Sequence, residues 1–228
     1  MSSNFYIVAT PIGNLEDITY RAVRILSEVD IILCEDTRVT GKLLKHYGIN
    51  TSMKSYHAQS SDAKEDAIVQ AIKSGTTYAL VSDAGTPTIS DPGVKLIARI
   101  REDVPDISIV PVPGAAALVA GLSTTGFNGN QFTFYGFLPH KKGRKTIFDS
   151  IESDAEKISI FYESPHRLMK TLQELSLRFG ETVRKICVAR ELTKLHESSI
   201  VGTANQVFQY YMENPDQVRG ECVVIIDK

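Results

Sequence analysis

Short apolar runs alternate with amphipathic stretches along the first half of the chain. The apolar runs at residues 5–9, 31–34, 77–81 and 107–112 have the length of buried strands, and residues 52–57 form a further plausible strand. Between the runs, apolar residues recur at helical spacing, as at Ala22, Ile25, Leu26 and Val29 after the capping residue Thr19. Further helices are expected at 40–47, 62–73 and 94–102. Strands that alternate with helices predict a mostly parallel sheet covered on both faces.

The pattern changes after residue 122. Residues 123–131 are rich in Gly, Asn, Ser and Thr, which is typical of a linker. Beyond the linker, the runs 185–193 and 198–203 are adjacent and are expected to pair as antiparallel strands. We therefore predict two α/β domains, residues 1–122 and 132–228, the second with a mixed sheet. Its other expected strands span 132–138, 158–162 and 222–226, and its helices span 144–152, 168–179 and 206–213.

Composition and charge narrow the function classes. Hydrophobic residues make up 43% of the 228 residues and charged residues 23%, as in soluble globular proteins. The net charge of −2 means that any contact with nucleic acid must come from a local basic patch. Cys34, Cys187 and Cys222 lie in apolar runs without CxxC spacing, so we expect buried thiols in a reducing compartment. No signal peptide and no run of about 20 apolar residues is found, which favours a cytoplasmic protein without membrane contact.

Three loops of similar character follow three of the expected strands. The loops at residues 10–14, 83–87 and 113–117 are rich in Pro, Gly and small residues. In a parallel sheet they share the carboxyl edge, where α/β proteins bind ligands. Gly85 allows close approach of a ligand, and Pro87 stiffens the loop. The alternative is a set of ordinary strand-to-helix turns. No loop matches GxGxxG or GxxxxGK[ST], which argues against a dinucleotide or ATP.

Charged motifs follow other strands. Glu35-Asp36-Thr37-Arg38 is either a local ion pair at a helix start or part of a substrate site. Ser164 and Pro165 fit a helix N-terminus, which leaves Glu163 and Arg167 free to face a cleft between the domains. The basic run HKKGRK, residues 140–145, is either a solvated loop or a phosphate contact. The five histidines show no metal-ligand spacing, and no GxSxG motif indicates a serine hydrolase.

Seven motifs, taken together and in this order, resemble the tetrapyrrole methylase superfamily. They are VATPIGNLEDIT, EDTR, VSDAGTPTISDPG, PVPGAAA, GFLP, FYESPHR and ARELTKLHE, and they span almost the whole chain. Ile12-Gly13 stands where the tetrapyrrole enzymes carry Pro-Gly, and Thr86 stands where they carry the Asp of a GDP motif. At these two positions the chain resembles instead the branch of the superfamily whose members methylate a ribose 2′-oxygen of a cytidine in small-subunit ribosomal RNA.

The resemblance implies two α/β domains with S-adenosylmethionine in the cleft between them, and a homodimer. It also implies which residues contact this cofactor. They are Ile12 and Gly13 in the first loop, Asp83, Ala84, Gly85, Thr86, Pro87 and Ile89 in the second, Pro113, Gly114, Ala115, Ala116 and Ala117 in the third, and Tyr162 and Glu163 in the second domain.

The activity implied is transfer of a methyl group to a ribose 2′-oxygen of the 16S RNA, within the assembled small subunit. Because the sulfonium leaving group is already activated, the protein mainly aligns the reactants, and a carboxylate that accepts the hydroxyl proton would help. Asp36 and Glu163 are the candidates for that role. Candidate phosphate contacts are Arg38, Lys141, Lys142, Arg144 and Arg167. A tetrapyrrole C-methyltransferase and a non-catalytic module that binds S-adenosylmethionine or RNA remain the alternatives.

Overall fold

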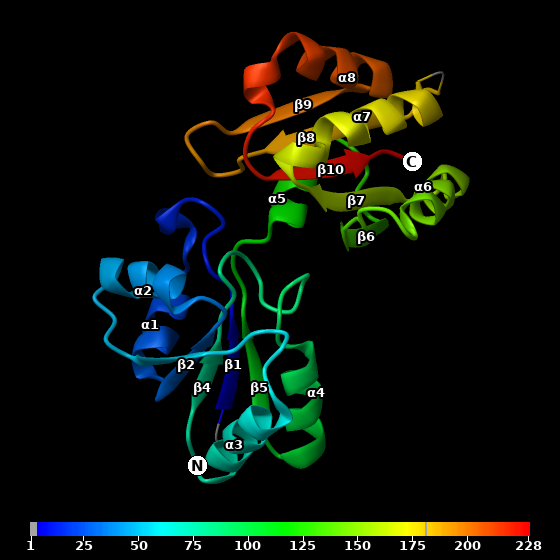
Figure 1. The fold of residues 1–228 in the computed structure, drawn as a ribbon. Coiled ribbons are helices and arrows are strands. Elements are labelled where there is room, and N and C mark those ends of the chain that lie inside the picture. The colour runs from blue at the N-terminus through cyan, green and yellow to red at the C-terminus, as the bar shows by residue number, and fades with distance from the viewer. Residues whose placement is uncertain (1–3, 181) are drawn as a thin grey trace. The chain divides into compact units, whose positions relative to one another are not determined.

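The first sheet consists of five parallel strands in the order β3-β2-β4-β1-β5 (Figure 1). The structure is a computed structural model that describes residues 4–180 and 182–228. The strands are β1 (Asn4–Val8), β2 (Ile31–Cys34), β3 (Ser52–Ser55), β4 (Tyr78–Leu80) and β5 (Ser108–Val112). Four helices connect them: α1 (Tyr20–Glu28), α2 (Thr37–His46), α3 (Asp62–Lys73) and α4 (Val94–Asp103). The predicted parallel sheet is confirmed.

Helices cover both faces of this sheet, as the alternating pattern predicted. On one face, α1 and α2 bury an apolar cluster that includes Leu26, Ile32 and Leu44. On the other face, α3 and α4 bury a second cluster around Ile68 and Leu96 (Figure 1). The inner strands of a sheet covered on both faces must be apolar on both sides, which explains the continuous apolar runs of β1, β2 and β4.

Polar residues set the points at which the helices begin. The hydroxyl of Thr19 accepts a hydrogen bond from the amide of Ala22 at 3.0 Å and caps α1, as expected. Helix α2 begins at Thr37 rather than at the expected residue 40. The reason is Asp36, whose carboxylate accepts the amide proton of Arg38 at 2.8 Å and so starts the helix earlier.

The second sheet is mixed, with the order β6-β7-β10-β8-β9. Its strands are β6 (Phe132–Phe137), β7 (Ile158–Glu163), β8 (Lys185–Arg190), β9 (Ser198–Thr203) and β10 (Cys222–Ile226). Strands β6 and β7 are parallel, whereas β10 and β8 pair antiparallel with their neighbours. The predicted mixed sheet and the predicted pairing of β8 with β9 are confirmed.

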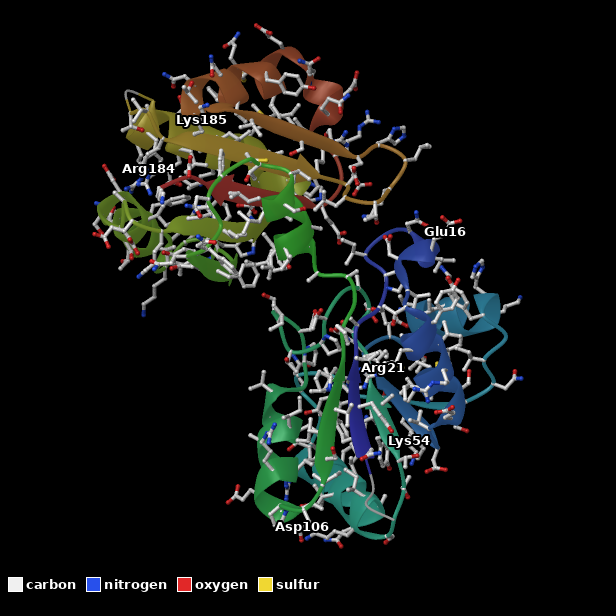
Figure 2. The ribbon with its side chains drawn as sticks, turned by 180° about the vertical axis from the view of Figure 1, so that it is seen from behind. Glu16, Arg21, Lys54, Asp106, Arg184 and Lys185 are labelled. Carbon is white, nitrogen blue, oxygen red and sulfur yellow. The ribbon has the colours of Figure 1, made fainter. Side chains whose placement is uncertain are left out.

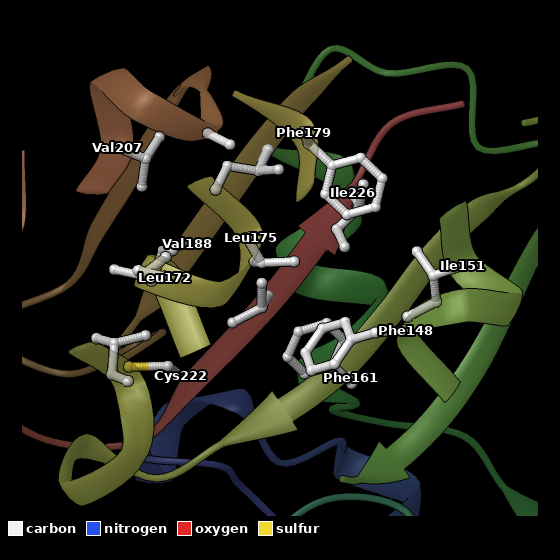
Figure 3. Packing of buried hydrophobic residues seen from close by; sticks show 14 of the residues in the cluster. Phe148, Ile151, Phe161, Leu172, Leu175, Phe179, Val188, Val207, Cys222 and Ile226 are labelled. Atoms are coloured by element: carbon white, nitrogen blue, oxygen red, sulfur yellow. The ribbon is translucent and has the colours of Figure 1, made fainter. Parts of the chain in front are cut away.

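One face of the second sheet packs against helices α6 (Arg144–Ser153), α7 (Pro165–Phe179) and α8 (Ala204–Glu213). The core between them is rich in aromatic residues and contains Phe148, Phe161 and Phe179 (Figure 3). The guanidinium of Arg184, labelled in Figure 2, lies over the ring of Phe179 and donates to the carbonyl oxygen of Ile151 at 3.0 Å. All three cysteines are free and buried, as expected.

The chain divides into two units at residues 1–116 and 117–228. We expected the division at 123–131, after the short helix α5 (Ala117–Ser123) rather than before it. Helix α5 packs on the face of the second sheet opposite the aromatic core: a Cβ built on Gly121 would lie 3.4 Å from side-chain atoms of Ala189, Val223 and Ile225. The helix therefore belongs to the second unit. In the described ranges, no helix is long and apolar enough to cross a membrane.

Candidate functional site

Hydrogen bonds join the three loops that the sequence analysis singled out. The backbone amide of Thr10 donates to the carbonyl oxygen of Gly85 at 2.9 Å, and the amide of Gly85 donates back to Thr10 at 3.0 Å. The hydroxyl of Thr86 donates to the carbonyl oxygen of Ala115 at 3.1 Å. These contacts connect the loops after β1, β4 and β5 at the carboxyl edge of the first sheet. The expectation that the three loops meet there is confirmed.

Buried hydroxyl groups stiffen this edge from within. The Thr10 hydroxyl donates to the carbonyl oxygen of Ser82 at 3.0 Å, and the Ser82 hydroxyl donates to that of Gly85 at 3.1 Å. Both side chains are buried, so they hold the loops and do not face a ligand. The surface of the edge is instead made of small or apolar residues. Those exposed to solvent are Gly13, Ala84, Ile89, Pro113 and Gly114, whereas Ile12, Asp83, Thr86, Ala115, Ala116 and Ala117 are half-buried and Pro87 is buried.

Two glycines allow the loops to come this close. Gly85 has a φ of +86°, in the left-handed region that other residues rarely adopt. A Cβ on Gly114 would lie only 2.9 Å from the Cβ of Ala9. Glycine at both positions therefore sets the geometry of the edge, independently of any ligand.

Asp36 lies at this edge but is bound to its neighbour. Its carboxylate receives hydrogen bonds from the Arg38 side chain, at 3.0 Å from Nε and 2.6 Å from Nη2, and from the Arg38 amide. These bonds lower the pKa of Asp36 to about 2. The Asp36 amide donates in turn to Asp83 Oδ1 at 3.0 Å and so ties α2 to the second loop. A carboxylate with such a low pKa is a poor proton acceptor near neutral pH, which disfavours the catalytic role suggested for Asp36.

Asp91, which follows the second loop, was not among the predicted site residues. Burial and, to a smaller extent, the negative charge of Glu35 raise the pKa of Asp91 to about 6, against a hydrogen bond with Ser82 that lowers it. A raised pKa of this kind is common for carboxylates that exchange protons near neutral pH. The signal in the sequence was the second acidic residue of SDAGTPTISD, which follows the loop 83–87 and precedes α4.

Glu163, the other catalytic candidate, is buried at the end of β7. It accepts hydrogen bonds from the Ser164 amide at 2.8 Å and the Thr171 hydroxyl at 2.7 Å. It also pairs with Arg167 at 2.8 Å and with Arg144 at 3.5 Å. This carboxylate is fully used inside the second unit, so its side chain is not placed as a general base.

The same pairing corrects two of the expected substrate contacts. Arg144 is buried, and Arg167 is half-buried with its Nη1 bonded to the carbonyl oxygen of Leu138 at 2.7 Å. Both guanidinium groups turn inward because the buried charge of Glu163 requires partners. Lys141 and Lys142 are exposed, as a substrate contact requires, and so is Arg38, although Asp36 pairs with it.

Tyr162 lies among aromatic side chains of the second unit. Its ring is in edge contact with Phe134 and Phe137, with ring centroids 4.9 Å and 5.3 Å away. Phe137 is 59% exposed, which is unusual for a large apolar side chain next to a core. In the parts of the chain that the structure describes, no group of three His, Cys, Asp or Glu side chains is placed to hold a metal ion.

Comparison with known proteins gives a consistent result. The family described as Tetrapyrrole (Corrin/Porphyrin) Methylases matches residues 4–207. The protein named Ribosomal RNA small subunit methyltransferase I from Haemophilus influenzae is 43% identical over 97% of this chain and 77% of its own length. Its namesake from Synechocystis is 46% identical, over 96% of this chain and 77% of its own length. The one from Bacillus subtilis is 45% identical, over 97% and 74%.

Solved structures share the fold at lower identity. A cobalt precorrin-4 methyltransferase, CbiF, aligns with a TM-score of 0.67 at 15% identity and covers 98% of this chain and 94% of its own. The methyltransferase CobJ aligns with a TM-score of 0.70 at 17% identity, over 100% of this chain and 95% of its own. At this identity the likeness concerns the fold alone.

Proposed function

The chain belongs to the tetrapyrrole methylase family, and within it we propose that it is an S-adenosylmethionine-dependent methyltransferase acting on a ribose 2′-oxygen of a cytidine in the 16S ribosomal RNA. The observation that carries the proposal is the identity of 43–46% with proteins named Ribosomal RNA small subunit methyltransferase I, over nearly the whole chain. The solved structures of CbiF and CobJ are only 15–17% identical. That difference favours the RNA substrate over a tetrapyrrole.

The residues at the carboxyl edge of the first sheet fit S-adenosylmethionine. Gly13, Ala84 and Gly114 are exposed and small, so their backbone groups are open to the polar atoms of a nucleoside and an amino acid. The edge is held rigid by the bonds between Thr10, Gly85, Thr86 and Ala115. A preformed cradle lowers the entropic cost of binding. We propose that the cofactor contacts are Ile12, Gly13, residues 83–87, Ile89 and residues 113–117, together with Tyr162 and the backbone of Glu163.

When bound, the cofactor would supply an electrophilic methyl group, and its sulfonium sulfur is a leaving group that needs no further activation. The task of the protein is then to hold the ribose oxygen in line with that methyl group and to exclude competing water. The hydroxyl proton must also leave. With Asp36 paired to Arg38 and Glu163 buried, Asp91 is the carboxylate at this edge whose pKa, about 6, suits proton acceptance. We propose that Asp91, in place of the two earlier candidates, takes this role.

The proposal includes a homodimer in the cytoplasm that acts on assembled small subunits. Arg38, Lys141 and Lys142 remain the candidate phosphate contacts, because all three are exposed cations. Such contacts position RNA without reading its sequence.

The test is transfer of labelled methyl groups from S-adenosylmethionine to small ribosomal subunits that lack this modification, followed by nuclease mapping. Label on one cytidine ribose supports both the reaction and the substrate. Binding of S-adenosylmethionine with label only on an added tetrapyrrole would favour the C-methyltransferase alternative. Failure to bind S-adenosylmethionine would overturn the assignment of the three loops.

A further inference from the structure

A basic groove lies on the surface of the second unit. It has a volume of about 420 Å³. Its walls come from the basic run before α6, from the first turn of α6 and from the middle of α7. The lining residues are His140, Lys141, Arg144, Lys145, Lys170, Gln173, Glu174 and Leu177. On α7 the spacing of Lys170, Gln173, Glu174 and Leu177 places them on one side of the helix.

Three lysines of the basic groove have no ionic partner among the described residues. Lys141, Lys145 and Lys170 are exposed, and within residues 4–180 and 182–228 none of them forms an ion pair. Glu174 is the one carboxylate in the lining, and it is already used: it lies 3.3 Å from Arg144 and 3.7 Å from Arg178. Other lysines are unpaired as well, but here three of them line one groove, whereas Lys95 and Lys194 are neutralised by carboxylates. A chain of net charge −2 therefore gathers unneutralised positive charge at this groove.

Buried bonds hold the groove in shape. Arg144 is only 8% exposed, and its Nη2 donates to the Thr171 hydroxyl at 2.7 Å. The Glu163 carboxylate pairs with Arg144, which lies near the end of the basic run. It also pairs with Arg167, which donates a hydrogen bond to the carbonyl oxygen of Leu138, just before the run begins. Both ends of the segment 138–144 are thus fixed to one carboxylate. A solvated loop needs no such support, whereas a binding site gains affinity from being preformed.

The start of α6 adds further hydrogen-bond donors. The helix begins after Gly143, whose φ of +87° turns the basic run into the helix, and no side chain caps it. The first amides of an uncapped helix favour an anion. Together with the free lysines, these donors indicate an anionic ligand.

We propose that the basic groove binds the phosphodiester backbone of the RNA substrate, an inference that rests on the proposed function. Lysines act as point charges for phosphate, and apart from the imidazole of His140 the lining offers no ring on which a base would stack. The groove thus positions the RNA and does not read its sequence. Lys145 of the basic run joins Lys141 as a contact residue, together with Lys170 and Gln173 of α7, which the basic run alone did not reveal.

The experiment compares two double variants of the full chain. Lys145→Gln with Lys170→Gln removes two charges from the groove. Lys73→Gln with Lys185→Gln removes two exposed charges elsewhere, at the end of α3 and at the start of β8, where Figure 2 labels Lys185. For each protein, the dissociation constant for unmodified small subunits is measured over a series of KCl concentrations. Binding of S-adenosylmethionine, binding of inorganic phosphate and thermal unfolding are the parallel readouts.

The groove variant is expected to bind the subunits on the order of ten-fold more weakly, with a salt dependence that is shallower by about one unit of log–log slope per lost contact. Its affinity for S-adenosylmethionine and its unfolding temperature stay those of the wild type. Equal effects of the two double variants would overturn the proposal. So would loss of inorganic phosphate binding with unchanged subunit binding, which would identify a site for free phosphate. If the subunits bind as expected but neither the wild type nor either double variant methylates them, the proposed function fails while the groove remains an RNA-binding site.

Discussion

Gly114 marks the closest approach of the loop after β5 to the end of β1. We predict that Gly114→Ala separates the joined loops, because its Cβ would lie 2.9 Å from the Cβ of Ala9 and 3.5 Å from its carbonyl oxygen. The backbone and the short side chain of Ala9 cannot move aside in the way that the end of a long, flexible side chain can. We expect a loss of about 1–3 kcal/mol in the free energy of unfolding and weaker binding of S-adenosylmethionine, measured by urea denaturation and by calorimetry.

Gly41→Ala is the matched control for that change. In α2, the added Cβ would lie 3.5 Å from Cε of Met53, an ordinary contact. Alanine in place of glycine inside a helix raises stability by up to about 1 kcal/mol, so this variant should be more stable than the wild type. If both alanines had the same effect, the close approach at Gly114 would not be what shapes the edge.

Asp91 gives a pH-dependent prediction. Burial raises its pKa from 3.8 to about 6, so between these values the folded protein retains a proton that the unfolded chain has released. The stability this provides is complete below pH 3.8 and is lost as the pH rises through 6. Asp91→Asn stays neutral throughout. We expect it to exceed the wild type in unfolding free energy by about 1 kcal/mol above pH 7, after allowance for solvent screening, and not at pH 4.

The measurement is urea denaturation at a series of pH values. Asp106→Asn, at an exposed turn where Figure 2 labels the residue, is the control for the loss of a surface carboxylate. A constant difference between Asp91→Asn and the wild type would mean that Asp91 is not desolvated. If Asp91 also accepts the substrate proton, the same variant lowers the rate of methyl transfer and removes the rise of that rate near pH 6.

At the scale of elements, Glu163 connects β7 to α6 and α7. We predict that Glu163→Gln lowers the free energy of unfolding by about 3 kcal/mol, because the guanidinium groups of Arg144 and Arg167 then lose their buried counter-charge. Glu174→Gln, at a half-buried position that also contacts Arg144, should cost less than about 1 kcal/mol. Chemical denaturation of both variants at neutral pH measures the difference.

The same variant separates a positioning role from a catalytic one. If Glu163 only holds the segment 138–144, Glu163→Gln raises the KM for small subunits while kcat at saturating subunits stays within a few-fold, at temperatures where the variant is folded. A fall of kcat by two or more orders of magnitude in the folded variant would restore Glu163 as the proton acceptor.

The elements were more predictable than the contacts between them. The bounds of β2, α3 and β10 follow from apolar periodicity and from capping residues, which are local properties. The partners of Glu163 are not local. In the sequence, Arg144 looks like its neighbours Lys142 and Lys145, and only the packing of α6 against α7 shows that it is buried. Asp91 was missed for the same reason, since its pKa depends on burial and on Glu35.

For the whole molecule, the two units were foreseen but their boundary was not. Composition favoured a linker at 123–131, because Gly, Asn and Ser are typical of exposed segments. Part of that segment is tied to the second sheet instead: the hydroxyl oxygens of Thr124 and Ser199 lie 2.8 Å apart, and Ser199 also contacts Cys187. A boundary depends on which sheet an apolar helix face covers, and α5 is too short for its periodicity to show that face.

Two fragments test this boundary. Val223, Ile225 and Ala189 are almost fully buried on the sheet face that α5 covers, so a fragment of residues 117–228 should unfold in one cooperative transition. A fragment of residues 124–228 exposes that face to water. Since each large apolar side chain uncovered costs about 1.5–3 kcal/mol, we expect this fragment to lose its cooperative transition and to bind a hydrophobic dye.

Circular dichroism during heating and dye fluorescence provide the readouts. A fragment of residues 113–228 serves as the control, because the four residues that it adds precede α5 and lie in the first unit, so it should match the fragment 117–228. Equal stability of the fragments 117–228 and 124–228 would assign α5 to the first unit and return the boundary to residues 123–131. Loss of the cooperative transition in the fragment 124–228 alone would instead show that α5 is required for the second unit to fold. The seven residues of α5 contribute no strand, so their removal would act only by uncovering one face of the five-stranded sheet.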